Sequence, residues 1–305
     1  MSLITHLPPA SGEVLLEGGE ATHSGSIWRM ILGVFFQNRL ATVGLGVIVF
    51  MVLFCFVGPL LYHTSQVFNN PNIANKIPSL AHPLGTDQVG YDVLGRLMLG
   101  GQTSLEIGFA AALIAVGIGA IWGAVSGLAG GVVDAVMMRV VDTLLAFPFL
   151  FALILLGAIF GTSIPELIIV IGLVAWLVPA RLVRGETLTL RMRDYVQAVV
   201  TMGGTTRRIL FRHIIPNTVG TIVVNATFQV ADAIIFVATL SYLGVGVSPP
   251  ATNWGGELAS GLNYLFDGYW WLIYPPGLAI VLTVVAFNFV GDAIRDALEV
   301  RLQRR

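Results

Sequence analysis

The stretch RDYVQAVVTMGGTTRRILFRHIIPN, residues 193–217, is polar and basic and lies inside a chain that is otherwise mostly apolar. Asp194 and Gln197 have the spacing of a helix capping box, so we expect a short helix to begin near Tyr195. The apolar ridge of this helix consists of valines at about one-turn spacing: Val196, Val199 and Val200. Because an isolated helix of about eight residues is marginal in water, we expect a partner surface to hold it.

Turn-forming residues divide this stretch into two helices. Gly203 and Gly204 end the first helix, and we expect Gly203 to be left-handed, a conformation in which a side chain costs roughly 1 kcal/mol or more. Thr205 or Thr206 can cap a second helix, which we expect Pro216 to end. An ordinary basic loop has no need of glycines and a proline at these positions, so the pattern favours a docking element over such a loop.

The same residues resemble the EAA loop of ABC-importer permeases. Gly203 follows Ala198 by five positions, and Pro216 comes thirteen further on. Gln197 and Val199 stand where that family usually has Glu and Ala, so the resemblance implies no charge at 197. In that family the loop is a coupling helix that docks in a cleft of the ATP-hydrolysing subunit. The coupling residues implied here are Asp194, Tyr195, Gln197, Ala198, Gly203, Arg207, Arg212 and Pro216.

Segments spread along the chain resemble the dipeptide/oligopeptide branch of these permeases, and in particular its second permease. They are RDYVQA (193–198), RHIIPN (212–217), HPLGTDQVGYDVLGR (82–96), RVVDTLLAFP (139–148) and NFVGDAIRDAL (288–298). The resemblance runs from about Phe35 to Leu298, in the same order and with similar spacing. It implies the type I ABC-importer permease fold.

Composition independently indicates an integral membrane protein. Of the 305 residues, 56% are hydrophobic and only 11% are charged, against about 25% charged in soluble domains. A Walker A loop needs a lysine before Ser or Thr, but the single lysine, Lys76, precedes Ile77. No HExxH motif occurs, and the net charge of −1 gives no sign of a nucleic-acid partner. We therefore expect no catalytic residue, metal or cofactor on this chain, so any ATP and Mg²⁺ belong to partner subunits.

Six apolar runs are each long enough to cross the hydrocarbon core, which takes about 20 helical residues. They cover roughly residues 41–62, 102–128, 136–160, 164–183, 217–244 and 271–291. The predicted fold is therefore all-α with six transmembrane helices. Small residues in the second run indicate close helix packing: Gly117, Gly119, Gly123 and Gly127. Kinks or local unwinding are expected at Pro148, Pro179 and Pro275-Pro276.

The distribution of positive charge predicts the orientation. Fourteen of the 16 basic residues lie before the first run, at Arg139, within 181–216 or after residue 291. By the positive-inside rule, both termini and the loop 184–216 are cytoplasmic. The connections that then face outside are 63–100, 160–164 and 245–270. Within the first of these, apolar residues at helical spacing predict a helix over 87–99 that lies along the membrane surface.

These runs divide the chain into four segments. Residues 1–25 read as a disordered cytoplasmic tail. Residues 26–100 form an N-terminal permease segment, in which 26–39 is amphipathic and is expected to lie at the lipid headgroups before the first span and the outer loop. The resemblance implies that residues 101–292 form the ABC transmembrane type-1 domain, with the coupling loop 184–216, and we expect 293–305 to be a cytoplasmic C-terminal tail.

Acidic and amide side chains at membrane depth are candidates for a translocation pathway or a buried polar network, because such groups must face protein or water. Asn225, Gln229 and Asp232 fall at i, i+4 and i+7 on the fifth run and form one polar stripe. Asp142 follows Arg139 by three residues, which favours an ion pair between them over a transport role.

The resemblance implies a permease subunit of an ATP-driven importer of dipeptides or oligopeptides in the plasma (inner) membrane. Its implied partners are a second homologous permease, two ABC ATPase subunits, an extracytoplasmic peptide-binding protein and membrane lipid. The same branch includes permeases for nickel and other small solutes, and the coupling motifs do not separate these. An ion-coupled carrier or channel that uses Asp232 as a relay is the alternative from another class, and it would need no ATPase.

Overall fold

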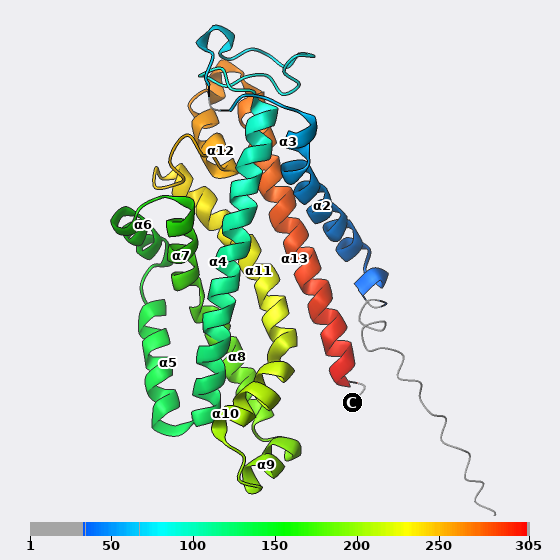
Figure 1. Cartoon of the computed structure of the whole chain (residues 1–305), viewed down its shortest axis with the longest axis vertical. Helices are drawn as coiled ribbons and strands as arrows, with labels where there is room; N and C mark the ends of the chain where they lie inside the picture. Colours follow the sequence, from blue (N-terminus) through cyan, green and yellow to red (C-terminus); the bar gives the residue numbers. More distant parts are fainter. Residues whose placement is uncertain (1–32, 34, 67, 304–305) are drawn as a thin grey trace, which may run out of the picture.

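The computed structural model describes residues 33, 35–66 and 68–303, and in these ranges regular structure is helical apart from one isolated bridge between Thr86 and Asp92. Long helices run side by side along the molecule (Figure 1). The predicted all-α class is therefore confirmed. The tail predicted over 1–25, and most of the amphipathic segment 26–39, lie outside the described residues.

Four helices in the described part of the chain are long and apolar enough to cross a membrane. They are α2 (Arg39–Phe56), α4 (Val93–Ala129), α13 (Tyr274–Gln303) and a continuous helix, Thr206–Tyr242, whose main part is α11 (Ile215–Tyr242). The last helix, α13, continues well beyond residue 291, where the sixth apolar run was predicted to end.

The third and fourth predicted spans are each broken in two. Helices α5 (Gly131–Leu145) and α6 (Phe149–Phe160) meet at 84°, and α7 (Ile164–Ala175) and α8 (Leu177–Leu190) meet at 42°. The described chain thus holds four candidate spans, or up to six when each bent pair is counted as one. The remaining short helices are α3 (Gly58–Leu61), η1 (Pro71–Ile73), α9 (Asp194–Thr201), α10 (Thr206–Ile209), η2 (Leu210–Ile214), α12 (Trp254–Leu262), η3 (Leu265–Asp267) and η4 (Trp270–Leu272).

Proline accounts for both breaks. Pro148 is the residue before α6, and Pro179 is the third residue of α8, so the two predicted irregularities are confirmed. The kink predicted at Pro275-Pro276 is wrong. These prolines lie in the first turn of α13, where a missing N–H removes no helical hydrogen bond.

The second long helix begins earlier than predicted. Asp92 caps it, because its Oδ1 accepts a hydrogen bond from the N–H of Gly95 at 2.8 Å. From Val93 the helix runs unbroken to Ala129, so the separate surface helix predicted over 87–99 is wrong. Val93 and Leu97 lie in the first turns of α4 and are buried, whereas Val89 precedes the helix and is 37% exposed.

Glycines bring α4 and α8 into close contact. A Cβ added to Gly123 would lie 2.3 Å from the carbonyl oxygen of Ala180, and one added to Gly127 would lie 2.8 Å from Thr187. Gly119 meets the same helix, as described below, whereas Gly117 has nothing within 4 Å. The predicted close packing is thus confirmed for three of the four glycines, which share one face of α4 at four-residue spacing.

The two ends of the molecule differ. At one end lie the segment before α4 and helix α12, which is fixed by the buried Trp254, whose Nε1–H donates to the carbonyl of Leu97 at 2.9 Å. At the opposite end lie α9 and α10 (Figure 1). The fold therefore separates the stretch 193–217 from the 63–92 and 245–270 segments by the whole length of the long helices.

Candidate coupling site

Helix α9 lies on the protein's own core. It has the expected length, eight residues, and Val196 on its inner face is 1% exposed. Val196 packs with Ile209, Leu210 and Ile214 of the following turns, and with Val183 of α8. Val199 is partly buried in the same cluster, whereas Val200 is exposed. The intramolecular core therefore holds the inner face of this short helix, which was not expected, and leaves its other face open.

The capping box predicted at Asp194 and Gln197 is wrong. Asp194 is the first helical residue and Arg193 takes the N-cap position, with no side-chain hydrogen bond at that cap. The amide Nε2 of Gln197 donates instead to the carbonyl of Arg191 at 2.8 Å. The carboxylate of Asp194, in the first turn, still suits the positive end of the helix.

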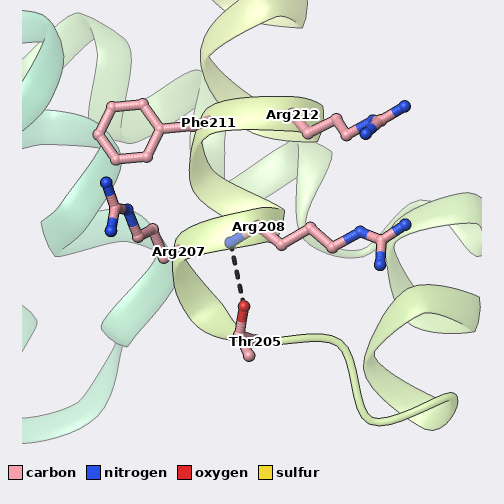
Figure 2. A pocket seen from close by; sticks show the side chains of 5 residues that line it. All are labelled: Thr205, Arg207, Arg208, Phe211 and Arg212. Carbon is pink, nitrogen blue, oxygen red and sulfur yellow. Dashed lines mark hydrogen bonds between the residues drawn. The ribbon is translucent and has the colours of Figure 1, made fainter.

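The turn after α9 forms as predicted. Gly203 has φ +77°, the left-handed region, and a Cβ there would meet nothing within 4 Å, so backbone preference alone demands glycine. At Gly204, by contrast, a Cβ would lie 2.5 Å from the side chain of Val199. The hydroxyl of Thr205 accepts a hydrogen bond from the N–H of Arg208 at 3.4 Å and caps α10, as predicted (Figure 2).

Pro216 does not end the second helix, as had been predicted. The chain passes from α10 through a π-helical turn, η2, directly into α11, and Pro216 lies in the first turn of α11. The wider π turn shifts the hydrogen-bond pattern just before a residue that has no N–H to donate. As a result, the coupling stretch and the long helix α11 form one continuous element.

A shallow basic cleft of about 580 Å³ lies on α10 and η2. Its lining residues are Thr205, Arg207, Arg208, Phe211 and Arg212. Figure 2 shows Arg207 and Phe211 on one side of the helix, and Arg208 and Arg212 on the other. None of the three guanidinium groups forms an ion pair with another described residue, and Phe211 is 56% exposed. Like charges one turn apart repel each other, so this surface favours an acidic partner.

The open face of α9 continues this surface with apolar side chains. Tyr195, Ala198 and Met202 are exposed, Met202 by 78%. The ring of Tyr195 lies 6.3 Å from that of His213, which connects α9 to η2. The candidate site is therefore a surface on α9, α10 and η2 that combines exposed apolar groups with arginines that form no ion pair with another described residue. Such a surface can bind a protein.

The predicted stripe on α11 is not one connected network. Gln229 is buried, and its Nε2 donates to the carbonyl of Ala175 at 3.0 Å. Asn225 donates within its own helix, to the carbonyl of Thr221 at 3.1 Å. Asp232 is exposed, and no hydrogen bond joins its carboxylate to another described residue. The three side chains thus have three different environments.

The ion pair predicted between Asp142 and Arg139 is wrong. Asp142 pairs instead with Arg181 of α8, across 2.5 Å, and each side chain is about half exposed. A larger cluster that the sequence did not indicate lies closer to the coupling end. Arg184 holds both carboxylate oxygens of Asp134 at 2.6 Å, and Ser126 donates to the same group. Three helices, α4, α5 and α8, are joined there, and no motif spacing predicts a contact between residues so far apart in sequence.

A second cluster that the sequence did not indicate lies at the opposite end. A pocket of about 140 Å³ there is lined by Asp87, Arg96 and Glu257, among other residues. Glu257 accepts a hydrogen bond from the hydroxyl of Thr252 at 3.2 Å. Burial raises the pKa of Glu257 to about 8, although the nearby guanidinium of Arg96 acts in the other direction.

The chain belongs to the family of binding-protein-dependent transport system inner membrane components, which matches residues 96–304. The family of N-terminal transmembrane domains of oligopeptide transport permease C matches residues 26–83. The fold and the two matches together define a multi-pass, inner-membrane permease component of a transport system, in agreement with the resemblance seen in the sequence.

Individual relatives are similar over nearly the whole chain. The oligopeptide transport system permease protein OppC of Haemophilus influenzae is 40% identical over 276 residues, which cover 90% of this chain and 88% of that protein. OppC of Bacillus subtilis is 41% identical over 283 residues, covering 92% and 91%. The dipeptide transport system permease protein DppC of Bacillus subtilis is 37% identical over 283 residues, covering 93% and 87%.

Proposed function

We propose that this chain is the transmembrane permease subunit of an ATP-driven importer that carries dipeptides or oligopeptides across the inner membrane. Relatives named for oligopeptide and dipeptide transport cover about nine-tenths of its length and support this substrate class over nickel or another small solute. Six spans, with each bent pair counted as one, and cytoplasmic termini suit the type I permease fold. The positive-inside pattern supports this orientation.

The proposed assembly contains a second homologous permease, two ABC ATPase subunits and an extracytoplasmic peptide-binding protein, all in or at the lipid bilayer. Membership of a binding-protein-dependent family supports the last of these. In the proposed assembly, ATP and Mg²⁺ bind to the ATPase subunits. The present chain carries out no covalent chemistry and moves its substrate by changing shape.

The observation that carries this proposal is the architecture of residues 193–217. One face of α9 is fixed to the core through Val196, and the other presents exposed Tyr195, Ala198 and Met202 beside unpaired arginines. A cleft with apolar walls and an acidic rim on an ATPase subunit would match this surface in shape and charge. The proposed coupling residues are Asp194, Tyr195, Gln197, Ala198, Gly203, Arg207, Arg212 and Pro216.

The same architecture supplies a mechanism for alternating access. When ATP binding brings the two ATPases together, each pulls on the coupling helix that it holds. Helix α9 is joined to α8 by a short turn, and α10 leads through η2 into α11 without a break. A displacement of the coupling site therefore moves two membrane helices. The pathway then opens outward to receive a peptide, and hydrolysis resets it.

The first prediction tests the docking face. Ala198→Asp places a carboxylate on an exposed position of α9 that faces no described core residue, so the permease should fold but repel an acidic partner rim. We expect the ATPase subunits to be lost, or reduced at least tenfold, when the tagged permease is purified from membranes. Such a loss corresponds to about 1.4 kcal/mol or more of binding free energy.

Val132→Asp is the matched control. Val132 is 79% exposed and lies in the first turn of α5, outside α9. A carboxylate at this position interacts favourably with the positive end of the helix dipole. This variant should retain the ATPase subunits. Full retention by Ala198→Asp as well would mean that α9 is not the docking element.

A separate experiment decides between the two substrate classes. It compares the uptake of labelled peptides with the uptake of labelled nickel by the complex in liposomes.

A further inference from the structure

A proline in α8 leaves one buried carbonyl without its helical partner. In an α-helix the carbonyl of Ala175 accepts a hydrogen bond from the N–H of residue 179, which here is a proline and has none. Ala175 is the last residue of α7, at the 42° bend. It is 8% exposed and Pro179 is buried, so water does not replace the lost donor easily.

Gln229 supplies the missing donor from another helix. Its Nε2 donates to the carbonyl of Ala175 at 3.0 Å, and both groups are buried. Helix α4 also packs closely against the bend. A Cβ added to Gly119 would lie 2.6 Å from Cβ of Pro179 and 2.8 Å from the carbonyl oxygen of Trp176. The bend is therefore enclosed by two neighbouring helices, one of which makes a specific hydrogen bond to it.

This hydrogen bond joins the end of α7, at the α7–α8 bend, to α11, and so gives α8 a second connection to α11 through the bend. At the coupling end the two helices are already connected, because Val183 of α8 packs in one cluster with Val196 and Ile214. At 1.5 Å per residue, the helix from Val183 to the bend at Ala175 is about 12 Å long, and the helix from Ile214 to Gln229 is about 22 Å long. The two helices, the coupling stretch and the Gln229 hydrogen bond thus form a closed frame.

We propose that Gln229 is a positioning residue that locks the α7–α8 bend to α11, so that a displacement of the coupling site turns α8 and α11 as one body. The proposal rests on the proposed function for the origin of that displacement. Without the hydrogen bond, the upper end of α8 is held by packing alone, and the bend can change independently of α11.

The test compares Gln229→Leu with the unaltered protein in the assembled complex. Leucine removes the donor at nearly the same size, so amide hydrogen exchange across residues 172–184 should quicken about tenfold, because a buried acceptor loses its partner. The ratio of ATP hydrolysis with peptide-loaded binding protein to hydrolysis without it should fall several-fold. Unchanged exchange overturns the proposal. Faster exchange with an unchanged ratio overturns the role in coupling.

Asn288→Leu is the matched control. The amide of Asn288 lies on a long helix, α13, and donates to the carbonyl of Val284 in its own helix at 2.8 Å. Loss of this amide leaves the bend untouched, so both the exchange of 172–184 and the hydrolysis ratio should stay as in the unaltered protein. An equal effect of the two variants would assign the changes to general loosening of the bundle and overturn the proposal.

Pro179→Ala should rescue the loss, because alanine at 179 supplies the backbone N–H donor that the carbonyl of Ala175 lacks. In the Pro179→Ala background, Gln229→Leu should no longer quicken exchange across 172–184, which makes a double-mutant cycle for this one hydrogen bond. If Gln229→Leu alone prevents assembly, the double variant should recover it. An equal effect of Gln229→Leu in both backgrounds, or no recovery, overturns the proposal. If binding protein does not stimulate even the unaltered complex, the proposed function fails, while the exchange results still decide the role of Gln229.

Discussion

The acidic side chains of this molecule lie in different environments, which their positions in the sequence do not indicate. Asp142 is half exposed and paired with Arg181, and Asp134 is held by Arg184 through both of its oxygens. Glu257 instead lies in the wall of a small pocket and accepts a hydrogen bond from a threonine hydroxyl, with no ion pair to another described residue. Its raised pKa follows from that poorly compensated burial.

The raised pKa of Glu257 predicts that the free energy of unfolding depends on pH. Its pKa rises from 4.5 to about 8 on folding, so the folded chain binds the proton more tightly than the unfolded chain. The stabilisation from this group is full below pH 4.5 and is lost as the pH rises towards 8. Glu257→Gln stays neutral at every pH, so its stability relative to the unaltered protein should rise by about 4 kcal/mol between pH 5 and pH 8.5.

Thermal unfolding of the two proteins in detergent, from pH 5 to pH 8.5, measures this difference. The control is Glu166→Gln, which removes a carboxylate from the first turn of α7 and should give no gain at high pH. Parallel stability curves for Glu257→Gln and the unaltered protein would show that Glu257 is already ionised at neutral pH.

For the helices, turns and caps set by local backbone preference were predicted correctly from the sequence, whereas features set by contacts between helices were not. Glycine at 203 and the threonine cap at 205 follow from backbone preference, and both were found. The capping box failed because Asp194 lies one position inside the helix. The end expected at Pro216 failed because a π turn carries the helix through it. Breaks at two prolines were predictable, but their angles depend on neighbouring helices.

Contacts between elements were the least predictable part of the candidate site. The inward face of α9 and the partner of Asp142 both depend on how α4, α5 and α8 pack, which no single spacing encodes. The glycines on α4 were the exception, since their four-residue spacing already indicated close approach. The amide of Gln229 had been placed on a polar stripe, yet its partner on the α7–α8 bend appears only in the three-dimensional structure.

At the scale of the whole molecule, the arrangement and the charge pattern agree. Helices α9 and α10 lie at one end, α12 and the segment before α4 at the other, with the long helices between them (Figure 1). Seven arginines lie between residues 181 and 212, in the part of the chain that carries α9 and α10. An importer needs this polarity, because ATP and the binding protein act on opposite sides of the membrane.

Labelling of single cysteines tests that orientation. In a Cys55→Ala background, Asn69→Cys and Phe266→Cys should react in sealed cells with an impermeant thiol reagent, since both positions are exposed and Phe266 is 98% exposed. Met202→Cys, in the turn after α9, should react only after the membrane is opened. Reaction of Met202→Cys in sealed cells, at the rate of the other two, would reverse the proposed topology.

In the proposed function, residues 193–217 pass nucleotide-driven motion to the membrane helices, and a substitution at Gly203 can test this role without removing any packing contact. A side chain at 203 meets open space, so Gly203→Asn and Gly203→Val differ mainly in backbone preference. Asparagine tolerates the left-handed conformation, whereas a β-branched residue resists it.

The measurement is peptide uptake together with ATP hydrolysis stimulated by the peptide-loaded binding protein, for the assembled complex in liposomes. Gly203→Asn should keep most of both activities. Gly203→Val should insert into the membrane normally but lose uptake and stimulation, because α9 no longer lies in its docked position. Coupled transport by Gly203→Val at the level of Gly203→Asn would show that residues 193–217 do not couple ATP hydrolysis to transport.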